Sequence, residues 1–249
     1  MAESNSPIST PFKEGRFATT HWTVILAAGS PDSSRYHQAL ETLCQTYWFP
    51  LYAYLRRQGY DAHQAEDYTQ GFFATLLEKQ GLRTADPKQG RFRSYLLGAL
   101  KHFLSDQRDY ERAQKRGGGR PALSLDLADA ETRYAIEPGT TLSPEQLFEK
   151  SWALTLLDRT LARLRAEAIK AGNEQLFDHL KRSLTRNLDS VAHRTAAQQL
   201  GMTEGAVRTA VHRLRQRYRT ILRDEIAQTV SSQDEIEAEI RDLFNAFAG

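Results

Sequence analysis

The sequence predicts an all-α protein made of two small helical domains joined by a flexible linker. Apolar residues recur at three- and four-residue spacings through most of the 249-residue chain, as in helices that bury one face. No alternating apolar run of strand type is longer than a few residues, and no asparagine-glycine hairpin turn occurs. A chain of this length suits two domains of modest size, each with a core of its own.

Composition favours a folded protein that stays in the cytoplasm. Hydrophobic residues make up 40% and charged residues 26% of the chain, which is ordinary for a globular protein. The longest apolar runs, such as residues 24–28, fall short of the ~20 residues that a bilayer-spanning helix requires, so we expect no membrane association. Residues 1–13 lack the basic start and apolar core of a secretory signal. Cys44 is the only cysteine, which excludes an internal disulfide and a thiolate zinc cluster.

The first domain is predicted over residues 36–116, after an N-terminal extension of residues 1–35. A helix from about residue 36 to 58 should end at Gly59, and Asp61 can cap a second helix that returns antiparallel to the first. A third helix, ending before Gly117, turns its aromatic and leucine side chains inward. It should leave a set of basic residues largely outside, namely Arg93, Lys101, His102, Arg108 and Arg112.

The linker is predicted over residues 117–142, because three successive glycines carry a heavy entropy cost in a helix and no sustained period follows them. The second domain, residues 143–226, should open with a capping box of Ser143 and Gln146 around a proline in the first helical position. An acidic extension, residues 227–249, carries an apolar stripe. We favour its packing on the second domain over a regulatory contact that masks the DNA-binding face.

A helix-turn-helix is predicted between Thr195 and Tyr218. Small alanines allow two helices to cross closely, and residues 200–202 (LGM) supply a short turn that contains glycine. Thr203 can then cap the second helix, with Glu204 near its positive end. Apolar positions of that helix follow the core period, whereas basic residues step along a different face, namely Arg208, His212, Arg215 and Arg219.

This basic face predicts DNA binding. The start of the second helix should reach base edges in the major groove, with Arg208 as our first choice for base readout, while later arginines would contact phosphates. A solvated surface helix is the alternative for an isolated basic run, but the capped turn in register favours DNA binding. The residues predicted to bind DNA here are Thr203, Glu204, Arg208, Thr209, His212, Arg213 and Arg215.

Three segments, in order, resemble the extracytoplasmic-function group of bacterial RNA polymerase sigma factors, within the sigma-70 family. Residues 65–73 (AEDYTQGFF) look like region 2.2, residues 92–106 (starting FRSYLL) look like regions 2.3 and 2.4, and the helix-turn-helix is similar to region 4.2. The resemblance covers nearly the whole chain. It implies a sigma factor that binds core RNA polymerase and directs promoter-specific initiation at −35 and −10 elements, with an anti-sigma factor as a further potential partner.

The resemblance also implies residue roles in the first domain. Glu66, Asp67 and Gln70 would face the polymerase clamp. Melted DNA offers unstacked bases, on which aromatic side chains stack while cations hold phosphates. The residues that would lie near the −10 strand are Tyr95, Lys101, His102, Arg108 and Arg112. Tyr95 stands where the family usually has a tryptophan, and because it also lies on the apolar stripe, a core role is equally open.

Two other classes stay open. A helix-turn-helix regulator that acts without polymerase would read paired half-sites as a dimer, but nothing resembles a dimer zipper, so we expect a monomer. A small helical hydrolase would need catalytic or metal-binding spacing, and no P-loop or dinucleotide glycine pattern occurs. We therefore expect no enzymatic activity and no cofactor. The residues that do not pair convincingly for catalysis or metal binding are His21, Asp67, His102, His179, His193 and His212.

Overall fold

The computed structural model describes residues 34–78, 91–113, 130–136, 141–186, 190–230 and 233–247. Within these ranges every regular element is an α-helix or a short 3-10 helix, and there is no strand. The prediction of an all-α fold is therefore confirmed for the described part of the chain.

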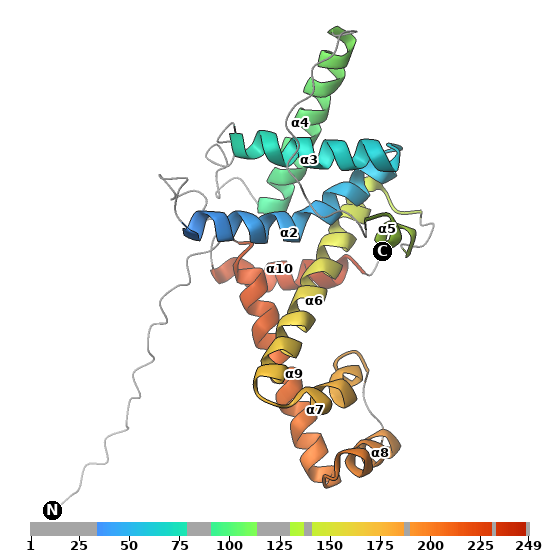
Figure 1. Cartoon of the computed structure of the whole chain (residues 1–249), viewed down its shortest axis with the longest axis vertical. Coiled ribbons are helices and arrows are strands. Elements are labelled where there is room, and N and C mark those ends of the chain that lie inside the picture. The colour runs from blue at the N-terminus through green and yellow to red at the C-terminus, as the bar shows by residue number, and fades with distance from the viewer. Residues whose placement is uncertain are drawn as a thin grey trace, which may run out of the picture.

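The first three helices are α2 (Ser34–Arg57), α3 (Ala62–Glu78) and α4 (Phe92–Ala113). Gly59 ends the turn after α2 with a φ of +96°, a conformation that glycine adopts without strain. The Asp61 side chain accepts a hydrogen bond from the Gln64 backbone N–H at 2.8 Å, and the Gln64 side chain accepts one from the Asp61 N–H. These two bonds form the predicted cap, and α3 then runs back across α2 (Figure 1).

A short helix, α5 (Ala130–Ile136), lies within the predicted linker. Its Glu131 carboxylate accepts hydrogen bonds from the Tyr52 hydroxyl at 2.6 Å and from the Arg56 guanidinium at 2.8 Å. Ala130 is fully buried, and the Arg133 guanidinium lies 4.0 Å from the centre of the Phe49 ring. The prediction of little structure was wrong for these seven residues. The helix is too short for its apolar residues to show a helical periodicity in the sequence, and contacts with α2 stabilise it. Residues 117–129 and 137–140 of the linker lie outside the described residues.

The second half of the chain contains two long helices, α6 (Pro144–Lys170) and α9 (Glu204–Ala227), which pack against each other (Figure 1). The predicted capping box is present, with Ser143 and Gln146 each accepting from the other's backbone N–H. The shorter elements are α7 (Glu174–Leu180), η3 (Lys181–Leu184), α8 (Ser190–Leu200), η4 (Gln233–Glu235) and α10 (Ile236–Asn245).

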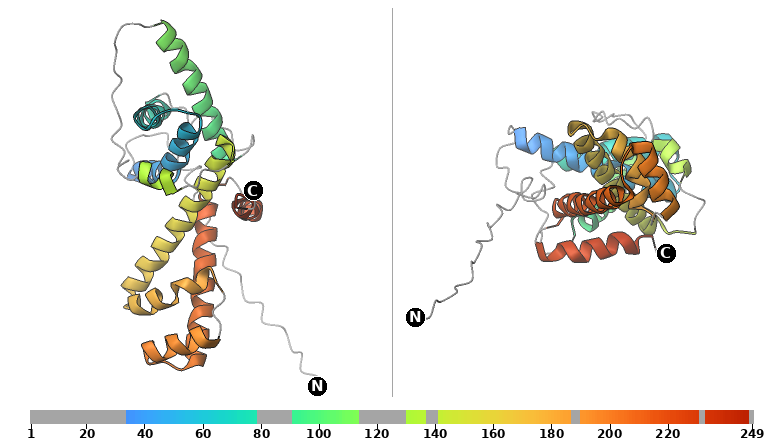
Figure 2. Two further views of the ribbon diagram at one scale, coloured as in Figure 1. Left: turned by 90° about the vertical axis from the view of Figure 1, so that its right-hand side faces the viewer. Right: turned by 90° about the horizontal axis from the view of Figure 1, so that it is seen from below.

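Buried side chains form one large core and two small clusters. The large core joins α2, α3 and α4 to the first half of α6, the end of α9 and α10; with α5, we call these elements the main lobe. The small clusters join the rest of α6 and α9 to α7, η3 and α8, which we call the small lobe. The small lobe lies at the far end of the molecule from α4 (Figure 2). Both long helices therefore contribute to both lobes.

The acidic helix α10 packs on α6 and α9, as favoured for the C-terminal extension, and it also reaches α4. Here the expectation that Arg93 lies outside was wrong, because its side chain is only 3% exposed. The guanidinium stacks 4.3 Å from the centre of the Trp152 ring and pairs with Glu149 of α6 and Glu239 of α10. Carboxylates from α6 and α10 pair with this arginine and bury it. The spacing of apolar residues in α4 does not indicate contacts with other helices.

Candidate nucleic-acid interface

Helices α8 and α9 are joined by a tight turn at residues 201–203. Gly201 has a φ of +62°, and the Met202 N–H donates to the Ala197 carbonyl at 2.9 Å, which closes the end of α8. Thr203 then takes an extended conformation, and its hydroxyl oxygen accepts from the Ala206 N–H at 3.2 Å. The glycine turn and the threonine cap are both as predicted.

Small residues set how closely the two helices approach. Ala196 and Ala197 of α8 are buried together with Val207 and Val211 of α9. Leu180 of α7 completes this cluster, so the start of α9 is held from two sides. The opposite side of α9 is left exposed.

The exposed start of α9 carries most of the predicted contact residues. The Arg208 side chain is 62% exposed, and Thr209, His212 and Arg213 are also exposed. Thr203 is exposed and Glu204 is half-buried at the helix start, so these predicted residues share one end of the helix.

Glu204 lies between two guanidinium groups. Its Oε1 accepts from Arg194 Nε at 3.2 Å, and its Oε2 lies 3.8 Å from Arg208 Nη2. Arg194 belongs to α8 and is not among the predicted contact residues, because the predicted motif begins one residue later, at Thr195. A signal for it was present in the sequence, because Arg194 lies two residues before Ala196 and Ala197, the alanines that pack α8 on α9. The arrangement places one arginine from each helix at the same edge of the turn.

Arg215 does not lie on this open edge. Its guanidinium donates to the Ser183 carbonyl at 2.7 Å and 2.9 Å and to the Arg186 carbonyl at 3.0 Å. The side chain is half-buried and ties the segment after α7 to the middle of α9. The prediction that Arg215 steps along the free basic face was therefore wrong, because backbone carbonyls distant in sequence hold its guanidinium.

Further along α9 the positive charge is offset by α6. Arg217 makes two hydrogen bonds of 2.7 Å to the Glu167 carboxylate. These bonds raise the pKa of Arg217 and lower that of Glu167. Arg217 is thus held by two short hydrogen bonds, whereas Arg208 at the start of the same helix has only the longer 3.8 Å contact with Glu204.

The predicted −10 residues on α4 are more scattered. Tyr95 is half-buried and packs against the main core, with its ring stacked 6.2 Å from that of Phe92. Lys101 is exposed, but its ammonium lies 2.8 Å from Glu145 of α6, which raises the lysine pKa and lowers that of the glutamate. Arg108 donates to the Tyr60 hydroxyl at 2.8 Å. His102 is exposed, and the Arg112 side chain lies outside the described residues.

The residues predicted to face polymerase lie on α3. Asp67 is exposed and its carboxylate lies 3.0 Å from His63 Nδ1, while Glu66 and Gln70 are half-buried. This set and the α4 set belong to the main lobe, whereas the start of α9 lies at the other end of the molecule (Figures 1 and 2). The structure therefore presents two separate candidate surfaces.

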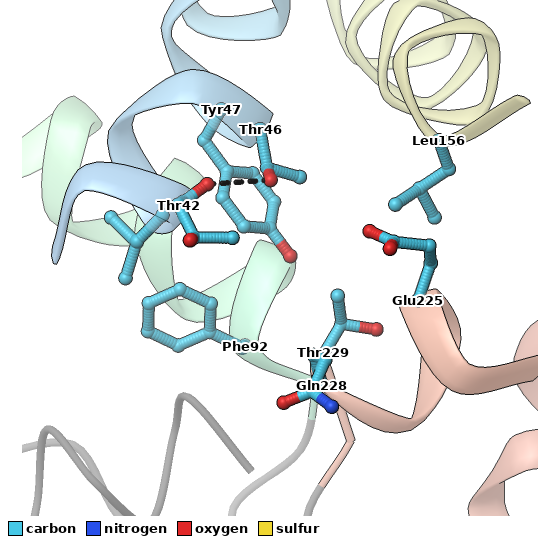
Figure 3. A pocket seen from close by; sticks show the side chains of 9 residues that line it. Thr42, Thr46, Tyr47, Phe92, Leu156, Glu225, Gln228 and Thr229 are labelled. Carbon is cyan, nitrogen blue, oxygen red and sulfur yellow. Dashed lines mark hydrogen bonds between the residues drawn. The ribbon is translucent and has the colours of Figure 1, made fainter. Parts of the chain in front are cut away.

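The described residues hold no group of three or more histidine, cysteine, aspartate or glutamate side chains arranged for a metal ion. Among their helices, none has the length and apolar character that would be needed to cross a membrane. A small cavity lies between α2, α4, α6 and α9 (Figure 3). Its volume of about 20 Å³, measured for the centre of a water-sized sphere, is enough for about one water molecule. The feature that stands out is the exposed arginine Arg208 at the start of the capped helix α9.

The chain matches no family model, no curated protein and no solved structure. Its geometry defines an all-helical protein in which a capped helix follows a glycine turn and exposes arginines at its start.

Proposed function

We propose that this chain is a sigma factor that binds core RNA polymerase and directs initiation at promoters with −35 and −10 elements. The observation that carries the proposal is the exposed start of α9, where Arg208 projects from a capped helix beside Arg194. Arginines at such a position can reach guanine edges in a major groove while neighbouring groups contact phosphates.

In this proposal the small lobe, with the start of α9, binds the −35 element, and helices α3 and α4 of the main lobe contact polymerase and the −10 strand. Two weak contacts on one chain raise overall affinity through effective concentration. The acting form is a cytoplasmic monomer without enzymatic activity. The exposed residues Lys101, His102 and Arg108 on α4 support a contact with nucleic acid by the main lobe.

The test is selection of promoter DNA from random duplexes with core polymerase, followed by transcription in vitro. Arg208→Gln should weaken binding of the selected −35 element by roughly 10- to 100-fold, because a lost bidentate base contact costs about 1–3 kcal/mol. Core polymerase binding should stay within about twofold of the parent, because that contact belongs to the first domain.

Arg217→Gln is the matched control, since it removes the same charge from the same helix at a side chain already paired with Glu167. We expect less than about a threefold loss of DNA binding, as for one phosphate contact. A folded chain that neither binds core polymerase nor directs initiation would contradict the proposal. If it instead bound duplex DNA alone as a dimer, a regulator independent of polymerase would replace it.

A further inference from the structure

Two arginines at the start of α4 are covered by carboxylates from other helices. Arg91 Nε lies 3.1 Å from Glu239 of α10, and the same guanidinium pairs with Asp242. Arg93 pairs with Glu239, lies 2.6 Å from Glu149 of α6 and lies 3.7 Å from Asp242. Two of these three carboxylates belong to α10.

Helix α10 therefore sets the sign of the charge at this end of α4. With α10 in place, two arginines face three carboxylates, so the site has a net negative charge. Without α10, the same arginines face Glu149 alone, and the site would be positive. It would then lie on the same helix as the exposed Arg108.

Burial of these charges has a cost that only complete pairing offsets. Burial raises the pKa of the Glu239 carboxyl, although Arg93 and Arg91 oppose the shift. Charged groups removed from water add little net stability even in good geometry, and each arginine that loses its carboxylate needs another anion to replace it. The contact between α10 and α4 is made by such ion pairs, whereas Ile236 and Leu243 anchor the other face of α10 in the main core.

A small cavity lies between the end of α9 and the first residue of α4, and no residue of α10 lines it. The cavity of Figure 3 is lined by Gln228 and Thr229, which follow α9, and by Phe92, the first residue of α4. The Tyr47 hydroxyl points into this space, and it has no hydrogen-bond partner among the described residues.

We infer that α10 is a displaceable acidic cover on a phosphate-binding site formed by Arg91 and Arg93, whose ligand is the backbone of single-stranded DNA. The choice of this ligand rests on the proposed function, in which α4 lies along a melted strand. When α10 covers the site, its net negative charge repels phosphates. When α10 is displaced, two arginines face Glu149 alone, and the site gains a net positive charge. The C-terminal helix thus reduces DNA binding by the free chain.

The first test measures binding of a fluorescent oligothymidine to the full chain by anisotropy. Glu239→Gln should tighten binding roughly fivefold, because apparent affinity scales with the population of the binding-competent state. The slope of log affinity against log salt should steepen by about 1.4 if two more phosphates are contacted. A folded Glu239→Gln chain with the affinity and slope of the parent would overturn the inference.

Glu237→Gln is the matched control on the same helix, because Glu237 pairs with Arg223 of α9 and not with α4. Its oligothymidine affinity should equal that of the parent, and an equal gain in both variants would overturn the specific role of Glu239. If circular dichroism shows that Glu239→Gln does not fold, Asp242→Asn replaces it. Asp242 is 30% exposed and contacts both arginines, so we expect a smaller increase in oligothymidine affinity. A folded Asp242→Asn chain with the affinity of the parent would also count against the cover.

The second test follows the cover directly, with spin labels on Ser94→Cys of α4 and Asn245→Cys of α10 in a Cys44→Ala background. Both label positions are exposed, whereas Cys44 is buried. Saturating oligothymidine should lengthen the distance between the labels. DNA binding without any change in this distance would overturn the cover and leave the proposed function standing. If DNA displaces α10 but the chain does not bind core polymerase, that result would count against the proposed function alone.

Discussion

The two lobes are held together by different means. The main lobe buries large side chains, among them Trp152, Tyr52 and Phe148 with no exposed surface. The clusters of the small lobe contain alanines, valines and a few larger residues, and much of its order comes from the Gly201 turn, the Thr203 cap and the Arg215 bonds to backbone carbonyls. The end of the molecule with the exposed arginines therefore has less apolar burial, and we expect it to open locally at lower cost.

The largest expected effect tests the main lobe. Trp152→Ala should lower the free energy of unfolding by about 3–5 kcal/mol, because it leaves a cavity and removes the ring on which Arg93 stacks. Urea unfolding followed by circular dichroism measures the loss. Trp48→Ala is the control, since Trp48 is only partly buried, and equal losses in the two variants would mean that the core does not depend on Trp152.

The next effect separates the lobes. Gly201→Ala should cost roughly 1–2 kcal/mol, because an alanine at a φ of +62° is strained whatever the space around it. Hydrogen exchange should accelerate around residues 195–210 and stay unchanged in α2. If amide protection is lost in both lobes together, the small lobe does not unfold independently of the main lobe.

Gly98→Ala is the matched control for that substitution. Gly98 lies inside α4, and an added Cβ would meet nothing within 4 Å. Alanine should stabilise the helix by about 0.5–1 kcal/mol, through its lower conformational entropy in the unfolded chain. The same chemical change should therefore shift stability in opposite directions at the two glycines, as read from urea midpoints.

The smallest effect concerns α5 on the main lobe. Hydrogen bonds from Tyr52 and Arg56 hold the pKa of Glu131 below its ordinary value of 4.5. A carboxyl whose pKa is lowered by folding contributes stability above its unfolded pKa, and that contribution is lost as the pH falls through the folded pKa. Glu131→Gln should therefore lower the melting temperature slightly at neutral pH, and the difference should vanish in acid. A constant difference across the titration would mean that Glu131 acts through shape and not charge.

Local signals in the sequence predicted much of the fold and of the candidate interface. Caps and turns depend on a few adjacent residues, so the roles of Asp61, Ser143, Gly201 and Thr203 follow from the residues next to them. The three- and four-residue spacing of apolar side chains likewise indicated the buried faces of the long helices.

The errors share one physical cause, which is pairing between residues distant in sequence. Arg93 and Arg215 were expected to be solvent-exposed, and each is instead held by oxygen atoms that lie more than 25 residues away. The docking of α5 also depends on such a pair, between Arg56 and Glu131. A basic residue on a periodic helix does not reveal whether a distant carboxylate or carbonyl will reach it.

The path of α6 has a consequence for any attempt to study the small lobe alone. The helix begins in the main core, where Leu147, Phe148 and Leu156 are buried against α2 and its neighbours, and it ends in the small lobe. A fragment of residues 143–226 would expose this apolar stripe to water, and such a surface favours self-association. Binding measured on that fragment would then report an aggregate, so a useful fragment needs polar replacements along the first half of α6.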